Sequence, residues 1–98
     1  MIFSTGTLKL PNGFVAELHA ISSIKFILDE ELLALTILSW GDETAYLKGF
    51  PPTEQIASIP FNDVPNSKGV LTSILQSVYN SSGPLPNVTP ISNPAMSK

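Results

Sequence analysis

The hydrophobic positions of the chain alternate with polar ones in several short runs, a pattern typical of β-strands. The first run, residues 7–10, is followed by Asn12 and Gly13. Asn-Gly is a strong signal for a two-residue hairpin turn, because both residues tolerate a positive φ. We therefore predict a hairpin whose second strand covers residues 14–21 and continues over residues 22–28.

An acidic triplet at residues 29–31 interrupts this pattern, and two interpretations of the following segment remain open. In the first, the triplet is a turn and residues 32–40 form the return strand, which residues such as Thr36 and Trp40 favour. In the second, the aspartate of the triplet caps a helix over residues 30–39. The glutamates would then lie near the positive end of the helix dipole, and the leucines are good helix formers.

The middle of the chain predicts a turn and two further strands. Residues 40–44 have turn composition, and residues 45–50 read as a strand that ends at two consecutive prolines. Residues 55–61 alternate again. Because Pro60 has no N–H to donate to a neighbouring strand, we expect this segment to be an edge strand or to end there.

The C-terminal part predicts a helix followed by an arm. Asn66 or Ser67 can cap a helix over about residues 67–80, whose apolar residues recur at helical spacing: Val70, Leu71, Ile74, Leu75, Val78 and Tyr79. Residues 81–98 are rich in Pro, Asn and Ser and nearly uncharged, so we expect a flexible or extended tail. The predicted class is α+β: a single β-rich domain over residues 1–80, with a small antiparallel sheet (hairpin, meander or sandwich-like) and one C-terminal helix.

Composition favours protein partners over other ligands. Charged residues make up 13% of the 98 residues, about half the usual share, and the net charge is −3 with no arginine. This balance argues against nucleic acid and against anionic membrane surfaces as partners. The most apolar window, residues 21–40, carries four charged residues and is not a membrane span. A weakly charged surface predicts burial against copies of the chain, as a homo-oligomer, or against a larger assembly.

Residues that carry chemistry are few. There is no cysteine, and His19 is the only histidine, so we interpret it as an ordinary strand residue and not as a catalytic or metal-binding group. The acidic residues at 29–31 and 42–43 lack the spacing of a calcium loop and read as charged turns. We predict no catalytic, cofactor or metal site and no enzymatic activity. The N-terminus lacks the basic start of a signal peptide, so a cytoplasmic location is expected outside a virion.

Two groups of residues are candidates for partner binding. Trp40 and Tyr46 flank the predicted turn, and aromatic residues at loop tips are favoured anchors in recognition, although both are also common in strands that pack in a core. The second group consists of the apolar and proline residues of the tail, which would reach a neighbouring subunit: Pro84, Leu85, Pro86, Val88 and Ile91.

The segment Ile59–Val64, followed by Val70–Leu75, Tyr79-Asn80 and the tail, resembles the C-terminal part of small tailed-phage virion proteins. In those proteins a strand and an Asp-Val turn lead into a short helix and an arm. The resemblance implies a bacteriophage structural protein that acts by assembly, in capsid decoration, fibre anchoring or as a tail accessory. The alternative is a small, acidic, monomeric inhibitor that blocks a host protein.

Overall fold

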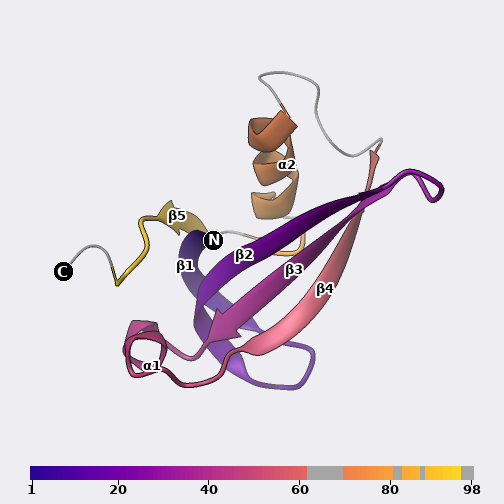
Figure 1. The fold of residues 1–98 in the computed structure, drawn as a ribbon. Coiled ribbons are helices and arrows are strands. Elements are labelled where there is room, and N and C mark those ends of the chain that lie inside the picture. The colour runs from indigo at the N-terminus through magenta and orange to yellow at the C-terminus, as the bar shows by residue number, and fades with distance from the viewer. Residues whose placement is uncertain (62–69, 81–82, 87, 96–98) are drawn as a thin grey trace.

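A five-stranded antiparallel sheet forms the body of the protein, in the spatial order β4-β3-β2-β1-β5 (Figure 1). The computed structural model describes residues 1–61, 70–80, 83–86 and 88–95. The strands are β1 (Ile2–Lys9), β2 (Val15–Ile27), β3 (Leu32–Trp40), β4 (Thr53–Pro60) and β5 (Thr89–Ile91). All neighbours are antiparallel, and β1 to β4 follow one another as a meander. The small antiparallel sheet of the predicted α+β class is therefore confirmed, as one sheet.

The β1–β2 hairpin is present, but its turn differs from the predicted one. The Leu10 N–H donates to the Phe14 carbonyl at 2.7 Å, and the Gly13 N–H donates to the Leu10 carbonyl at 2.9 Å. Gly13 has φ 90°, whereas Asn12 does not have a positive φ. This is the pattern of a type I turn followed by a left-handed glycine, and Pro11 suits the second position of such a turn. The loop therefore has three residues instead of two.

Residues 32–40 form a strand, which decides between the two interpretations left open by the sequence. β3 pairs with β2 on one side and with β4 on the other. Leu33, Leu35 and Ile37 are buried at alternate positions on one face, as the two-residue period of a strand requires. Glu31, with φ 54°, lies in the turn that joins β2 to β3.

The predicted strand over residues 45–50 is wrong, because this part of the chain contains the short helix α1 (Glu43–Leu47). The Asp42 carboxylate accepts a hydrogen bond from the Ala45 N–H at 2.8 Å, which caps the helix at its N-terminus. Gly49 adopts φ 80° just after the helix, the usual glycine ending. These two local signals outweigh the strand preference of the residues between them.

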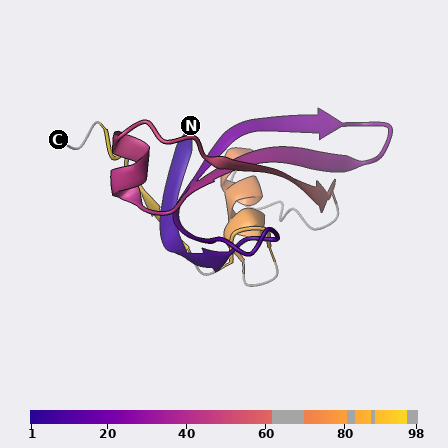
Figure 2. The same cartoon turned by 90° about the horizontal axis from the view of Figure 1, so that it is seen from below.

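Side chains are buried on both faces of the sheet. The helix α2 (Val70–Tyr79) packs on one face, in a core of Ile21, Leu33, Leu35, Ile37, Ile59, Ile74, Val78, Leu85 and Val88. The opposite face holds a smaller core, which includes Phe3, Leu18, Ala20 and Trp40. Figure 2 shows α2 below the long strands, and α1 at the end of the sheet away from the β2–β3 turn. The start of the predicted helix, at residues 67–69, lies outside the described residues.

The described part of the predicted tail packs against the protein's own body, and we call these residues, 83–86 and 88–95, the strap. Leu85 is 0% exposed, and its N–H donates to the Val78 carbonyl at the end of α2. Val88 is also buried, and β5 pairs with β1. Of the predicted flexible or extended tail over residues 81–98, the strap is extended at β5, but it packs on the protein's own body, where composition gave it no part in the core. Its few apolar residues fill the space between α2 and β1, and its extended backbone fits a sheet edge.

Two glycines make room for the strap. A Cβ atom at Gly6 would lie 3.0 Å from Val88 Cγ1, and Gly6 falls where the β1–β2 register shifts. A Cβ atom at Gly83 would collide with the carbonyl oxygens of Ser77 and Val78. Both positions therefore need a residue without a side chain, since backbone and core atoms already occupy the space.

Within the described part of the chain, neither helix has the length and apolar character needed to cross a membrane.

Candidate functional site

The histidine lies in the middle of the sheet, in a row of polar residues that crosses three strands. His19 in β2 is paired with Ser4 in β1 and with Ser39 in β3, and it is 0% exposed. Its Nδ1 lies 2.8 Å from Ser39 Oγ, and its Nε2 lies 2.8 Å from the Gly6 carbonyl oxygen. Because a carbonyl only accepts, Nε2 must carry the hydrogen, so in the neutral ring Nδ1 accepts from the Ser39 hydroxyl.

This environment keeps the imidazole neutral. Burial lowers the pKa of His19, and the hydrogen bond to Gly6 opposes this effect only in part. The pair resembles a serine nucleophile with its base, but the Ser39 side chain is only 3% exposed and its hydroxyl is engaged by His19. The geometry gives His19 a structural role, in which one side chain links β1, β2 and β3.

Two further hydroxyls are buried between β1 and α2. Ser4 Oγ and Tyr79 Oη make no hydrogen bond with the described residues. Burial raises the pKa of Tyr79, and the nearby Ser4 hydroxyl opposes this only in part, without reaching hydrogen-bond geometry.

The two acidic clusters lie at opposite ends of β3. The turn at residues 29–31 precedes this strand of nine residues, and residues 42–43 follow it. A strand of that length spans roughly 30 Å, so the two clusters cannot share an ion. Asp42 is also engaged as the cap of α1. Among the described residues, no group of three or more His, Asp or Glu side chains is placed to hold a metal ion.

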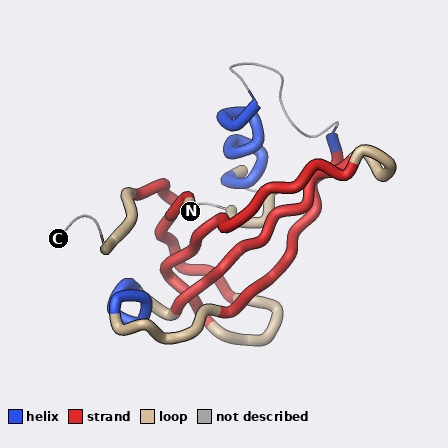
Figure 3. Tube along the Cα trace, viewed as in Figure 1, coloured by secondary structure: helices blue, strands red, loops and turns tan. Residues whose placement is uncertain are grey.

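An apolar groove of about 380 Å³ lies at the end of the sheet near α1. The groove is formed by the β1–β2 turn, the start of β2, the end of β3, α1, and the connection from α1 to the first residue of β4, which meet at the lower end of the sheet in Figure 3. The lining residues are Leu10, Phe14, Val15, Ala16, Ser39, Trp40, Gly41, Ala45, Phe50, Pro51 and Thr53. None of them is charged.

The groove has a fixed wall and exposed rims. Trp40 is buried, and its indole N–H donates to the Phe50 carbonyl at 3.1 Å, which holds the α1–β4 connection against the ring. Phe14 is 68% exposed and Phe50 is 58% exposed, although both are large apolar side chains. Two exposed phenylalanines beside one buried tryptophan give the groove apolar rims, and exposed apolar patches of this kind mark interaction sites.

The Trp40 ring is held by two other aromatic rings. The ring centroids of Trp40 and Tyr46 are 4.9 Å apart in an edge-on arrangement, and those of Trp40 and Phe3 are 6.3 Å apart. The Tyr46 hydroxyl donates to Asn93 Oδ1 of the strap at 3.2 Å. Because these contacts already fix the indole, the protein would lose little conformational entropy when a ligand binds against this wall.

The structure brings the predicted residues Trp40 and Tyr46 together, but only Trp40 lines the groove. The predicted tail residues lie elsewhere. Leu85 and Val88 are buried in the core, and Ile91 packs against the core on the other face. Leu85 and Val88 are therefore shielded by the protein's own core while the strap is in place.

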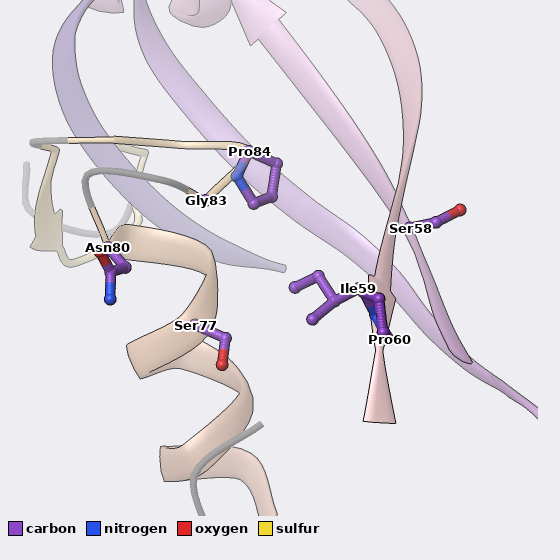
Figure 4. A pocket seen from close by; sticks show the side chains of 7 residues that line it. All are labelled: Ser58, Ile59, Pro60, Ser77, Asn80, Gly83 and Pro84. Atoms are coloured by element: carbon purple, nitrogen blue, oxygen red, sulfur yellow. The ribbon is translucent and has the colours of Figure 1, made fainter. Parts of the chain in front are cut away.

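A second hollow, of about 310 Å³, lies between β4 and the C-terminal end of α2. Figure 4 shows Ile59 pointing from β4 toward α2, with Pro84 of the strap nearby. The predicted Pro84 thus belongs to this hollow, and Pro86 is half-buried in the strap. None of the described side chains that line it is ionisable: Ser58, Ile59, Pro60, Ser77, Asn80, Gly83 and Pro84.

Sequence reasoning missed most of the groove. Phe14 directly follows the Asn-Gly turn, and Phe50 directly precedes two prolines. A large apolar residue at a turn is a signal for exposure, since turns lie at the surface. This signal predicts that each phenylalanine is exposed, but it does not show that the two lie at the same groove, which depends on the fold.

Comparisons with known proteins identify no relative: no family model, no curated protein and no solved structure matches the chain.

Proposed function

We propose that the protein is a non-enzymatic assembly protein that holds an apolar segment of a partner protein in the groove. The exposure of Phe14 and Phe50 beside the fixed Trp40 is the observation that carries this proposal. Binding energy at protein interfaces concentrates in aromatic side chains near well-packed pockets. The rings of Phe14 and Phe50 are in water in the free protein, and an apolar partner would remove them from it.

The chemistry of the groove favours a protein segment over a small ligand or nucleic acid. A small-molecule site normally has several polar groups that fix the orientation of the ligand. Here the polar side chains in the lining are those of Ser39 and Thr53, and Ser39 is already bonded to His19. A nucleic acid would need basic residues, and the chain has a net charge of −3.

The setting that we propose is a bacteriophage virion, with a role in capsid decoration, fibre anchoring or as a tail accessory. The resemblance of the C-terminal part to small tailed-phage virion proteins supports this setting, as does the low share of charged residues. An assembly role needs only durable contacts, and the groove supplies an apolar surface for one of them.

A fluorescence titration tests the groove, because Trp40 is the only tryptophan of the chain and lines it. The probe is a blocked apolar peptide, N-acetyl-Leu-Phe-Leu-amide, compared with a blocked Ser-Asn-Ser peptide. We expect only the apolar peptide to change the Trp40 emission. In a Phe50→Ser variant its Kd should rise about tenfold, since losing one such anchor costs on the order of 1–2 kcal/mol.

The matched control is Leu28→Ser, at a residue that is 73% exposed in the turn at the other end of β3. This variant should bind the apolar peptide like the unmodified protein. The proposal is wrong if the apolar peptide gives no change in emission, or if Phe50→Ser binds it as well as Leu28→Ser does.

One observation favours the inhibitor as a second candidate. The β2–β3 turn projects beyond the sheet (Figure 1) and combines exposed Phe26 and Leu28 with three acidic residues, 29–31. Such a tip fits a basic cleft with an apolar floor on a host protein. An inhibitor should slow the growth of bacteria that express it. Reversing Asp29 and Glu30 to lysine should then restore growth while Phe50→Ser does not; equal growth of all three strains would exclude this role.

A further inference from the structure

β4 forms one edge of the sheet, and in the described part of the chain no strand pairs with its outer side. It is the outermost of the long strands in Figure 3. Its register with β3 runs from Leu32↔Pro60 to Ser39↔Thr53 without a shift. The β1–β2 and β2–β3 pairs, by contrast, each contain an irregularity. β4 therefore presents a regular row of backbone groups outward.

The two edges of the sheet differ in how they are protected. Natural proteins guard exposed edges with lysines, prolines, bulges or very short strands. The β5 edge is short, with Pro90 at its centre. Between Pro52 and Pro60, β4 has no lysine, no bulge and a single charge, on Glu54. Its midpoint is Ile56, which is 70% exposed on the face that α2 does not cover.

We propose that a second copy of the chain pairs with β4 in antiparallel fashion, around a twofold axis at Ile56. Ile56 is the middle residue of the segment between the flanking prolines, residues 53–59, with three residues on each side. With Ile56 opposite itself, all of these residues have a partner, and Pro52 of each copy lies opposite Pro60 of the other. The prolines, which have no N–H to donate, then fall at the two ends of the paired segment.

The charge pattern also selects this register. Glu54 of one copy faces Ser58 of the other, so no like charges lie directly opposite. The two glutamates are four positions apart along the pair, roughly 13 Å, which exceeds the Debye length of about 10 Å at 0.1 M salt. A register centred on Gln55 would halve this separation, and one centred on Ala57 would leave Thr53 outside the paired segment.

This inference deepens the assembly role proposed above, but it uses a surface other than the aromatic rims of the groove. An edge pair with one apolar contact on its outer face is small beside the 1,200–2,000 Å² of a stable interface. We therefore expect a reversible dimer that forms as the concentration rises, and that is strengthened when the protein is concentrated in a larger assembly.

The absence of cysteine from the chain allows a test of both the pairing and its register. Directly opposite residues of an antiparallel pair have Cβ atoms about 4.5–5.5 Å apart, close enough for a disulfide after a small adjustment. Under mild oxidation, Ile56→Cys should form a covalent dimer at least tenfold faster than Leu28→Cys, which is equally exposed but lies in the β2–β3 turn, outside the proposed paired segment. Glu54→Cys and Ser58→Cys should link to each other in a mixture faster than either links to itself.

Equal rates for Ile56→Cys and Leu28→Cys would overturn the proposal, and self-linking of Glu54→Cys would overturn the register. Sedimentation velocity gives an independent test without a covalent bond. The mass of the unmodified protein should rise above 10.5 kDa as its concentration rises to about 1 mM, whereas Ile56→Lys should stay at the monomer mass. A monomer under all conditions would refute the dimer, yet peptide binding in the groove would remain testable through Trp40.

Discussion

Replacing Leu85 by alanine tests whether the strap belongs to the folded core. The composition of residues 81–98 predicts a flexible or extended tail that has no part in the core, for which this substitution would have almost no effect on stability. The structure instead buries the Leu85 side chain completely, in the core beside Ile74 and Val78 of α2. The two pictures therefore predict different free energies of unfolding for the same variant.

The magnitude follows from the atoms that are removed. Leucine to alanine deletes three carbon atoms, and each buried methylene contributes about 0.8 kcal/mol, or about 2.4 kcal/mol in total. The cavity left behind adds to this, so the expected loss is about 2.7–5 kcal/mol. A chain of 98 residues has a total stability of about 5–15 kcal/mol. The substitution should therefore remove a large part of the stability without abolishing the fold.

Urea unfolding followed by Trp40 fluorescence and far-ultraviolet circular dichroism measures this loss. With a slope of about 1–3 kcal/mol per molar urea, the midpoint should fall by about 1–5 M. Leu28→Ala makes the same chemical change at a residue that is 73% exposed, and it should shift the stability by no more than about 0.5 kcal/mol. If Leu85→Ala and Leu28→Ala have the same midpoint, the strap is not part of the core and this reasoning is refuted.

The remaining predictions concern two buried polar groups. Burial lowers the pKa of His19 below 6.5, so the unfolded chain takes up a proton before the native state does. The contribution of neutral His19 to the free energy of unfolding should be fully present above about pH 7. It should be lost as the pH drops through 6.5 toward the native pKa. The urea midpoint of His19→Gln should lose this slope, and an unchanged slope would contradict the assignment. Tyr79→Phe should cost nothing or add up to about 1 kcal/mol, because the Tyr79 hydroxyl is buried without a described hydrogen bond; a loss above 1 kcal/mol in the same assay would show that it is bonded.

The parts of the fold that local patterns determine could be predicted from the sequence. Alternation and turn residues indicated the β1–β2 hairpin, and Pro60 indicated that β4 lies at an edge. The helix α1 was missed because aromatic and apolar residues in a short run also suit a strand, and the cap of Asp42 was read as a turn. The strap was missed for another reason. Composition describes the average of a segment, whereas Leu85 and Val88 pack through contacts with distant parts of the chain.

The candidate site shows the same division between local and distant information. Its place next to a turn predicted Trp40 as either an anchor or a core residue, and it is buried in the core while it lines the groove. Phe14 reaches the groove because β2 and β3 pair in a particular register, whereas Phe50 is held there by the bond from the Trp40 indole to its carbonyl. The contact of His19 with Ser39, 20 positions apart, depends on that register too. A bulge in β2 determines which residues share a face of the sheet, and no local sequence pattern indicates where this bulge lies.

The two proposed surfaces, the groove and the β4 edge, meet at one residue. Their position relative to each other is therefore defined in the proposed assembly. Thr53 lines the groove and is also the first residue of β4. In the proposed dimer it faces Ile59 of the other copy, so each groove lies beside the junction of the two sheets.

A twofold dimer carries two such grooves and can hold two partner segments at once, which raises its overall affinity without any new contact. Thr53 takes part in both surfaces, so a segment bound in the groove can also contact the second copy. Such a segment must strengthen the dimer, and dimer formation must strengthen the binding of the segment by the same factor. Weak contacts of each kind are then sufficient for a stable assembly.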